Sequence, residues 1–184
     1  MEYKMKNVTF LTEEQLEDYI YFNRDKVHER GFPKFYKNTI RQFRLPNKKI
    51  IDLFTFEVDE STNTFYFRVI ELKKDFAGIE AISQVLLYMS IVRLYTYNLY
   101  ANVIGDYVLI GQTLPYISLV ATQYLQPHFS LFSYIFDFDG VKFITQPYAP
   151  KEIHKDADVF LLKLEKIPND YGYIDEEPAT EDGI

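Results

Sequence analysis

The chain has 184 residues, of which 47% are hydrophobic and 17% aromatic, so it is long and apolar enough to bury one sizeable core. The absence of cysteine excludes disulfide bonds and cysteine-based metal sites. No stretch has the length and apolarity of a membrane span, and the N-terminus lacks the apolar core of a signal peptide, so we expect a cytoplasmic protein.

Charge is distributed unevenly along the chain, whose formal net charge is −7. Between Arg24 and Lys49, nine basic residues stand against two acidic ones, which gives this segment a charge of +7. The segment ends close to Asp52, and it is either a surface that follows nucleic-acid phosphates or a solvated face of mixed loops. The residues that we expect to contact nucleic acid are Arg41, Gln42, Arg44, Lys48, Lys49 and Lys74.

The first predicted element is a helix that begins after Thr12, which opens a capping box. Apolar residues follow at helical spacing as far as Val27, and residues 31–33, which include glycine and proline, end the helix. Glu13 and Glu17 flank the apolar face. Either of them can join a neighbouring site, or both are acids of the helix start that interact favourably with the helix dipole.

Three strands are predicted next. Residues 37–45 alternate weakly and form the first strand. The β-rich runs that begin at Ile50 and Phe65 are separated by the polar residues 59–63, so they predict an antiparallel hairpin.

This hairpin would place Asp52 opposite Glu71, with Lys73 on the same face as Glu71. Two carboxylates suit Mg²⁺, for which we expect Mn²⁺ to substitute, and the carbonyl of Leu72 is a further candidate ligand. Lys73 can orient or deprotonate an attacking water. Because a Glu-x-Lys triplet is also common on solvated strand faces, the site depends on its context. Asp52 and Glu71 interrupt apolar runs, where charges are costly unless they are paired or metal-bound.

A long helix is predicted for residues 79–97. Its only charged residues are Glu80 and Arg93, so most of its surface should be buried. Gln84 lies on its more polar stripe, and because a buried glutamine needs hydrogen-bond partners, it can be a structural residue that satisfies backbone groups. Tyr88, one turn further on, is expected to be a core residue.

The rest of the chain is predicted to hold a strand at 107–110, a helix at 115–125, a hairpin across 139–140, and a last strand at 159–164 with a helix as the alternative. Residues 168–184 carry six acidic and no basic residues, which is typical of a flexible tail. The tail either aids solubility, shields the basic segment or docks a partner protein. We expect residues 1–167 to form a single domain.

The order Asp52, Glu71-Leu72-Lys73 and a helix with Gln84 and Tyr88 resembles the PD-(D/E)xK nuclease superfamily. Within it, the layout is similar to NucS-type nucleases and to related phage and restriction nucleases.

The resemblance covers roughly residues 12–112, and it departs from many members at residues 47–51, which stand in place of a Gly-rich turn. It implies an α/β fold with a restriction-endonuclease-like core, in which helices flank a central mixed β-sheet. The implied order is α-β-β-β-α-β with a C-terminal β-hairpin extension. The resemblance also implies that Glu13 joins the metal site and that Gln84 faces it.

We therefore predict a Mg²⁺-dependent endonuclease that acts on DNA, with RNA as the alternative substrate and a homodimer as one possible assembly. Its expected catalytic residues are Asp52, Glu71, Lys73, Gln84 and Glu13. The competing hypothesis is a nucleic-acid-binding or protein-interaction module that retains the fold without cleavage. The intact Asp, Glu and Lys trio favours the enzyme.

Overall fold

The computed structural model describes residue 10, residues 12–115, residue 118 and residues 128–146, which all belong to one compact unit. Two helices, α1 (Glu13–Phe22) and α2 (Arg24–Glu29), precede the strands β1 (Asn38–Arg44), β2 (Ile50–Asp59) and β3 (Thr64–Phe76). Helix α3 (Ile79–Thr96) then leads to β4 (Asn102–Thr113), β5 (Phe129–Asp137) and β6 (Gly140–Thr145). No helix of the described residues is long and apolar enough to cross a membrane.

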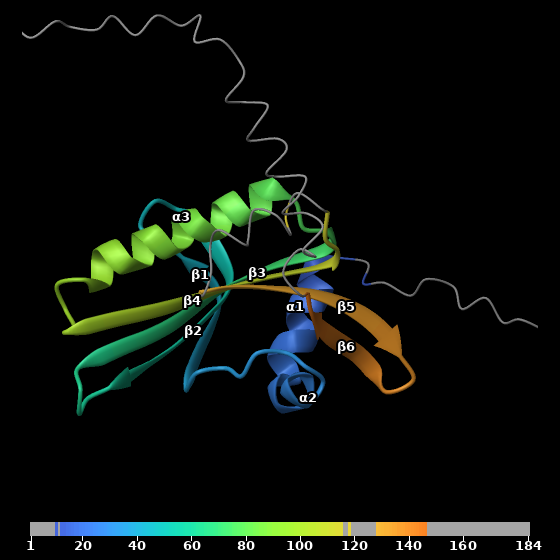
Figure 1. Cartoon of the computed structure of the whole chain (residues 1–184), viewed down its shortest axis with the longest axis horizontal. Helices are drawn as coiled ribbons and strands as arrows, with labels where there is room; N and C mark the ends of the chain where they lie inside the picture. Colours follow the sequence, from blue (N-terminus) through green and yellow to red (C-terminus); the bar gives the residue numbers. More distant parts are fainter. Residues whose placement is uncertain (1–9, 11, 116–117, 119–127, 147–184) are drawn as a thin grey trace, which may run out of the picture. The chain divides into compact units, whose positions relative to one another are not determined.

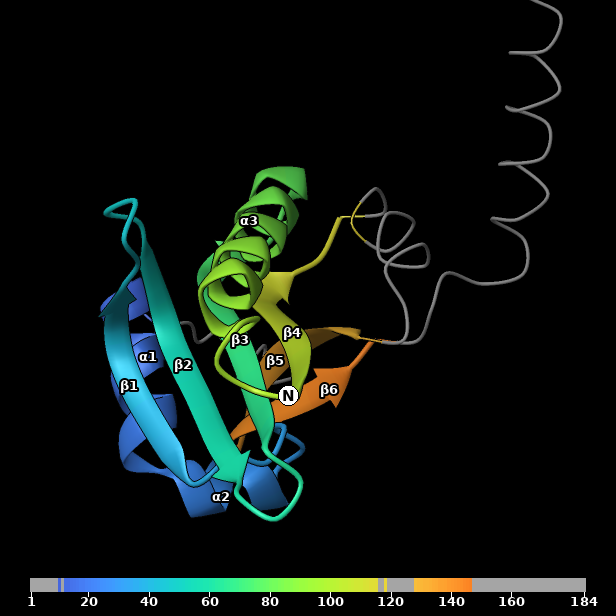
Figure 2. The ribbon, with the colours of Figure 1, turned by 90° about the vertical axis from the view of Figure 1, so that its left-hand side faces the viewer.

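The strands form one six-stranded mixed sheet in the order β1 to β6. Strands β1, β2 and β3 pair antiparallel, and α3 returns the chain so that β4 runs parallel to β3. Strand β5 is parallel to β4, and β6 pairs antiparallel with β5 (Figure 2). The predicted α/β class with a mixed sheet and flanking helices is therefore confirmed.

Helices cover both faces of the sheet, with α3 on one face and α1 and α2 on the other (Figure 1). Under α3 the core includes Phe54, Phe67, Val85 and Met89. The core of the opposite face includes Leu16, Ile20, Ile70 and Leu72. Strand β3 contributes to both cores, so most of its side chains are buried whichever way they point. Glu71, a charged residue in the buried part of β3, is therefore held in a largely apolar environment.

The first predicted helix is divided in two, and the expectation of one helix as far as Val27 was wrong. The cap is as predicted, since Oγ1 of Thr12 accepts the backbone N–H of Gln15 at 3.1 Å. The break comes at Asn23, whose side chain donates to the Tyr19 carbonyl at 2.8 Å. That carbonyl also accepts the backbone N–H of Asn23 at 3.2 Å, so the backbone and the side chain of Asn23 bind the same acceptor. Helix α1 ends here, and α2 begins at Arg24.

Strand β4 is much longer than the predicted strand at 107–110, because pairing with β3 continues over most of its length. Gly105 permits this pairing. A Cβ at this position would lie 2.4 Å from Cζ of Phe67 and 2.8 Å from Cε of Met89. The predicted strand at 159–164 and the acidic tail lie outside the described residues, as does most of the predicted helix at 115–125.

Candidate active site

Asp52 and Glu71 meet where the pairing of β2 and β3 ends. The last Cα partners of this ladder are Leu53 and Ile70, so the two carboxylates occupy the next positions on the two strands. Oδ2 of Asp52 accepts the backbone N–H of Leu72 at 2.8 Å. Glu71 is 3% exposed. The sequence-based expectation that these residues lie opposite each other agrees with this geometry.

Lys73 lies beside Glu71, with Nζ 2.8 Å from Oε1 of Glu71 and 3.7 Å from Oε2 of Glu13. The second oxygen of Glu71, Oε2, is buried and has no hydrogen-bond partner among the described residues. An unpartnered buried carboxylate oxygen is costly. The structure thus has one acceptor at this site whose partner is missing from the described part of the chain.

Burial gives both carboxylates unusual proton affinities. It raises the pKa of Asp52 to about 6, against the opposing effects of the Leu72 N–H and the charge of Lys73. It raises the pKa of Glu71 to about 7, and the negative charge of Asp52 acts in the same direction. Burial by itself would lower the pKa of Lys73, but Glu71 and Glu13 raise it overall. The site therefore favours any cation that can reach both carboxylates.

The two acids of α1 differ in their surroundings. Glu17 is 3% exposed, and its oxygens accept from Nε of Arg41 at 2.7 Å and from the side chain of Gln42. Glu13 has a side chain that is 50% exposed, and its carboxylate lies near Lys73. Glu13 is thus the more available of the two for a role at the site.

A cleft of about 410 Å³ opens at Asp52. Its lining consists of Glu13, Glu14, Glu17, Arg41, Gln42 and Asp52. Gln42 has a left-handed backbone with φ +48°, although it lies within β1. Such a conformation is strained for a residue with a side chain, and strained residues cluster at functional sites. Sequence reasoning missed this network, because nothing local in the sequence marks Gln42 as left-handed.

Tyr88 and Gln84, both on α3, differ in burial and in their surroundings. Tyr88 belongs to the core under α3, and burial followed by the charges of Glu71 and Asp52 raises its pKa. Its ring therefore forms part of the surroundings of the carboxylates. Gln84 lies one turn earlier on α3 and is half-buried, and its side chain forms no hydrogen bond within the described part of the chain. Its expected role in catalysis stays a prediction.

The six residues expected to contact nucleic acid fall into two groups. Arg44, the last residue of β1, and Lys48 and Lys49 of the following turn are exposed at the end of β2 that carries Asp52. They form no ion pair with another described residue. The others have partners within the protein. Arg41 pairs with Glu17 and, at 2.6 Å, with Asp18, Gln42 binds Glu17, and Lys74 pairs with Asp75 at 2.5 Å.

The site offers few side chains that can bind a divalent cation. Within the described ranges there is no group of three His, Cys, Asp or Glu side chains that could hold a metal ion. Mg²⁺ usually binds through only one or two carboxylates and keeps several waters. A half-buried carboxylate, Asp52, and a buried one, Glu71, whose Oε2 has no partner among the described residues, fit this mode of binding.

No protein-family model matches the chain, and no curated protein matches it. Two solved structures are similar to it. The crystal structure of a repair endonuclease from Pyrococcus abyssi is 20% identical with a TM-score of 0.44, over 68% of this chain and 48% of that one. The structure of an EndoMS–dsDNA2 complex is 17% identical with a TM-score of 0.44, over 72% of this chain and 48% of that one. The chain spans about half the length of each structure.

Proposed function

We propose that this chain is a metal-dependent nuclease of the PD-(D/E)xK type that hydrolyses phosphodiester bonds in DNA as an endonuclease. The observation that carries the proposal is the pair formed by the half-buried Asp52 and the buried Glu71, in which Oε2 of Glu71 has no partner within the described residues and Lys73 lies alongside. Two carboxylates with raised pKa values are costly in a core and are typical of a functional site.

Each residue of the site has a distinct role in this proposal. Asp52 and Glu71 would hold Mg²⁺ or Mn²⁺, with the carbonyl of Leu72 as a candidate ligand. Such a metal, when bound, would polarise the phosphate and lower the pKa of a coordinated water. Lys73, whose Nζ donates to Oε1 of Glu71, would orient that water or offset charge on the phosphate. Glu13, through its proximity to Lys73, supports this arrangement.

DNA is the substrate that the motif resemblance implies, and the exposed cations beside the site suit its backbone. Arg44, the last residue of β1, and Lys48 and Lys49 of the following turn lie at the end of β2 that carries Asp52 and have no carboxylate partner in the described part of the chain. Unpaired Lys and Arg side chains supply the salt-dependent, sequence-independent part of binding to nucleic acid. The fold that the motifs imply is a restriction-endonuclease-like core.

The experiment is incubation of the purified chain with supercoiled plasmid, linear duplex, single-stranded DNA and RNA. Each substrate is tested with Mg²⁺, Mn²⁺ or EDTA. We expect nicking of the closed circle with Mg²⁺ or Mn²⁺, and no product with EDTA or with an Asp52→Asn control. Cleavage that survives EDTA would overturn the proposal. Binding of DNA without any cleavage in either metal would instead support a non-cleaving binding module.

A further inference from the structure

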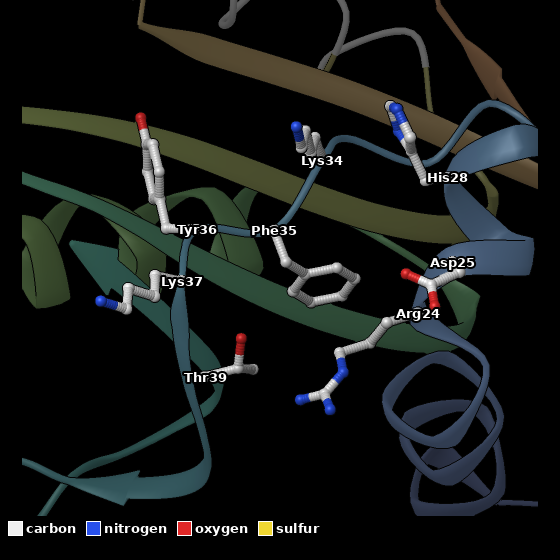
Figure 3. A pocket seen from close by; sticks show the side chains of 8 residues that line it. All are labelled: Arg24, Asp25, His28, Lys34, Phe35, Tyr36, Lys37 and Thr39. Atoms are coloured by element: carbon white, nitrogen blue, oxygen red, sulfur yellow. The ribbon is translucent and has the colours of Figure 1, made fainter.

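A second cavity, of about 310 Å³, lies between α2, the segment that follows it and β1 (Figure 3). It is lined by Arg24, Asp25, His28, Lys34, Phe35, Tyr36, Lys37 and Thr39. Figure 3 shows Arg24 extending from α2 toward Thr39 of β1, with the Phe35 ring beside them. Arg24, Lys34 and Lys37 are exposed, and none of them forms an ion pair with another described residue. The cavity therefore carries three permanent cations against one carboxylate.

One wall of this cavity is an irregular segment that is nevertheless held firmly. The guanidinium of Arg68 donates to the carbonyl of Lys34, lies 2.9 Å from Oδ2 of Asp106 and stacks 5.1 Å from the centre of the Tyr36 ring. The backbone N–H of Tyr36 donates to Oγ1 of the buried Thr55 at 2.8 Å. A site whose wall is fixed in advance loses less conformational entropy when a ligand binds.

The ring of Tyr21 links this cavity to the cleft of the candidate active site, because it contacts one arginine from the lining of each. The guanidinium of Arg24 lies 4.9 Å from the centre of this ring and that of Arg41 lies 5.2 Å from it. Arg41 lines the cleft that contains Asp52. The charge of Arg41 is matched by Glu17 and Asp18, whereas Arg24 has no carboxylate partner among the described residues. Arg24 is thus a cation without a carboxylate partner in the described part of the chain, on the same ring that Arg41 contacts.

The charge of the cleft explains why such a cation is needed. The cleft contains four acidic residues and only one basic residue, so without a metal it repels a polyanion. The binding free energy for a nucleic-acid backbone has to come from groups around the cleft. The β1–β2 turn supplies unpaired cations on one side of Arg41, and the second cavity supplies them beyond Tyr21.

We propose that the second cavity is a binding site for a backbone phosphate of the nucleic acid whose scissile bond lies in the cleft. Arg24, Lys34 and Lys37 attract the phosphate. The half-buried Phe35 ring provides a surface on which a sugar or base can pack. This inference rests on the proposed nuclease function. The cavity would bind the nucleic-acid backbone, and the cleft would carry out the hydrolysis.

The test compares Arg24→Gln/Lys37→Gln with a control of equal charge change, Arg93→Gln/Lys142→Gln, whose residues are exposed on α3 and β6. Fluorescence anisotropy measures the binding of labelled DNA and RNA of one sequence in Ca²⁺ at several salt concentrations. We expect the cavity variant to bind about tenfold more weakly or worse. The slope of log K against log salt should fall by about two, one for each cation removed. The control should bind like the wild type.

The outcomes separate this proposal from the nuclease proposal. If the cavity variant folds, as measured by thermal unfolding, and binds like the wild type, the cavity site is wrong whether or not the wild type cleaves. If the cavity variant and the control lose binding affinity equally, the cavity site is wrong as well. If the wild type does not cleave but the cavity variant alone loses binding, the cavity site stands and the nuclease function falls. A single Lys34→Gln variant gives an independent check, with an expected slope change of about one.

Discussion

The backbone N–H of Leu72 donates to Oδ2 of Asp52 at 2.8 Å, and this bond ties the carboxylate on β2 to the strand that carries Glu71 and Lys73. It sets the orientation of Asp52 before any ligand arrives. No hydrogen bond of the described residues occupies the other oxygen, Oδ1. The pair of carboxylates is thus arranged by main-chain geometry, and a variant of one side chain leaves the position of the other largely unchanged.

The first prediction is that Lys73→Ala separates metal binding from cleavage. Lysine is not a metal ligand, so calorimetric titration should show that Mg²⁺ or Mn²⁺ still binds, while nicking of supercoiled plasmid falls by about a hundredfold or more. Lys142→Ala on β6 is the control for the loss of one positive charge, and it should cut normally. A Lys73→Ala protein that cuts at the wild-type rate would remove Lys73 from the mechanism.

The second prediction concerns the stability of the metal-free protein. The pKa of Glu71 is raised to about 7 from its ordinary 4.5, so between these pH values the folded protein holds a proton that the unfolded chain has released. The free energy of unfolding should therefore fall as the pH rises through this window. Glu71→Gln should remove this part of the fall and stabilise the protein at pH 8 by on the order of 2 kcal/mol.

Urea unfolding in EDTA at pH 4.5 and pH 8 measures this effect. At the lower pH the wild type and Glu71→Gln should be nearly equally stable, because Glu71 is protonated there in the folded protein. The substitution should also weaken metal binding. A variant that is less stable than the wild type at pH 8 would show that the ion pair with Lys73 outweighs the cost of burying the charge.

The third prediction concerns the buried charge of Glu17. Arg41→Ala leaves this carboxylate without its cation, which should cost about 3–5 kcal/mol in the free energy of unfolding. Adding Glu17→Gln should restore much of the loss, since a neutral amide tolerates burial better than an unpaired carboxylate. A double-mutant cycle by urea unfolding gives the coupling. Strictly additive effects of the two substitutions would mean that the pair is not coupled.

Much of the hairpin that carries the site could be predicted from the sequence. Strand β1 lies within the predicted 37–45, and β2 and β3 pair across the predicted turn. Alternation along a strand has a period of two, so the side on which Glu71 and Lys73 project follows directly from their spacing. Their ion pair at 2.8 Å agrees with that expectation.

The network around Glu17 could not be predicted, because it depends on contacts between distant residues. Arg41 and Gln42 follow Glu17 by 24 and 25 positions, and the bond from Gln42 accompanies a left-handed backbone within a strand. Propensity gives no warning of such a conformation in a glutamine. The length of β4 was missed for a related reason, since its first half contains Asn102, Gly105 and Asp106, which are depleted in strands, and these residues become strand through pairing with β3.

The fourth prediction is that Gln84→Ala impairs cleavage more than folding. Gln84 has no hydrogen bond to another described residue, so its removal leaves no described group without a partner, and we expect the melting temperature to change little. The plasmid-nicking rate should fall if the amide serves the site. Ser83→Ala, one position earlier on the exposed side of α3, is the matched control. Parallel losses of stability and activity in Gln84→Ala would make Gln84 a structural residue.

The position of β3 in the sheet bears on the order in which the protein folds. Its pairing with β2 joins neighbours in the sequence, but its pairing with β4 must wait until α3 has crossed the sheet. Contacts that close long loops form slowly. Glu71 is enclosed only when both pairings and the helix are in place, so we expect its carboxylate to stay hydrated until then. The cost of burying the charge would therefore arise only once these elements have packed together.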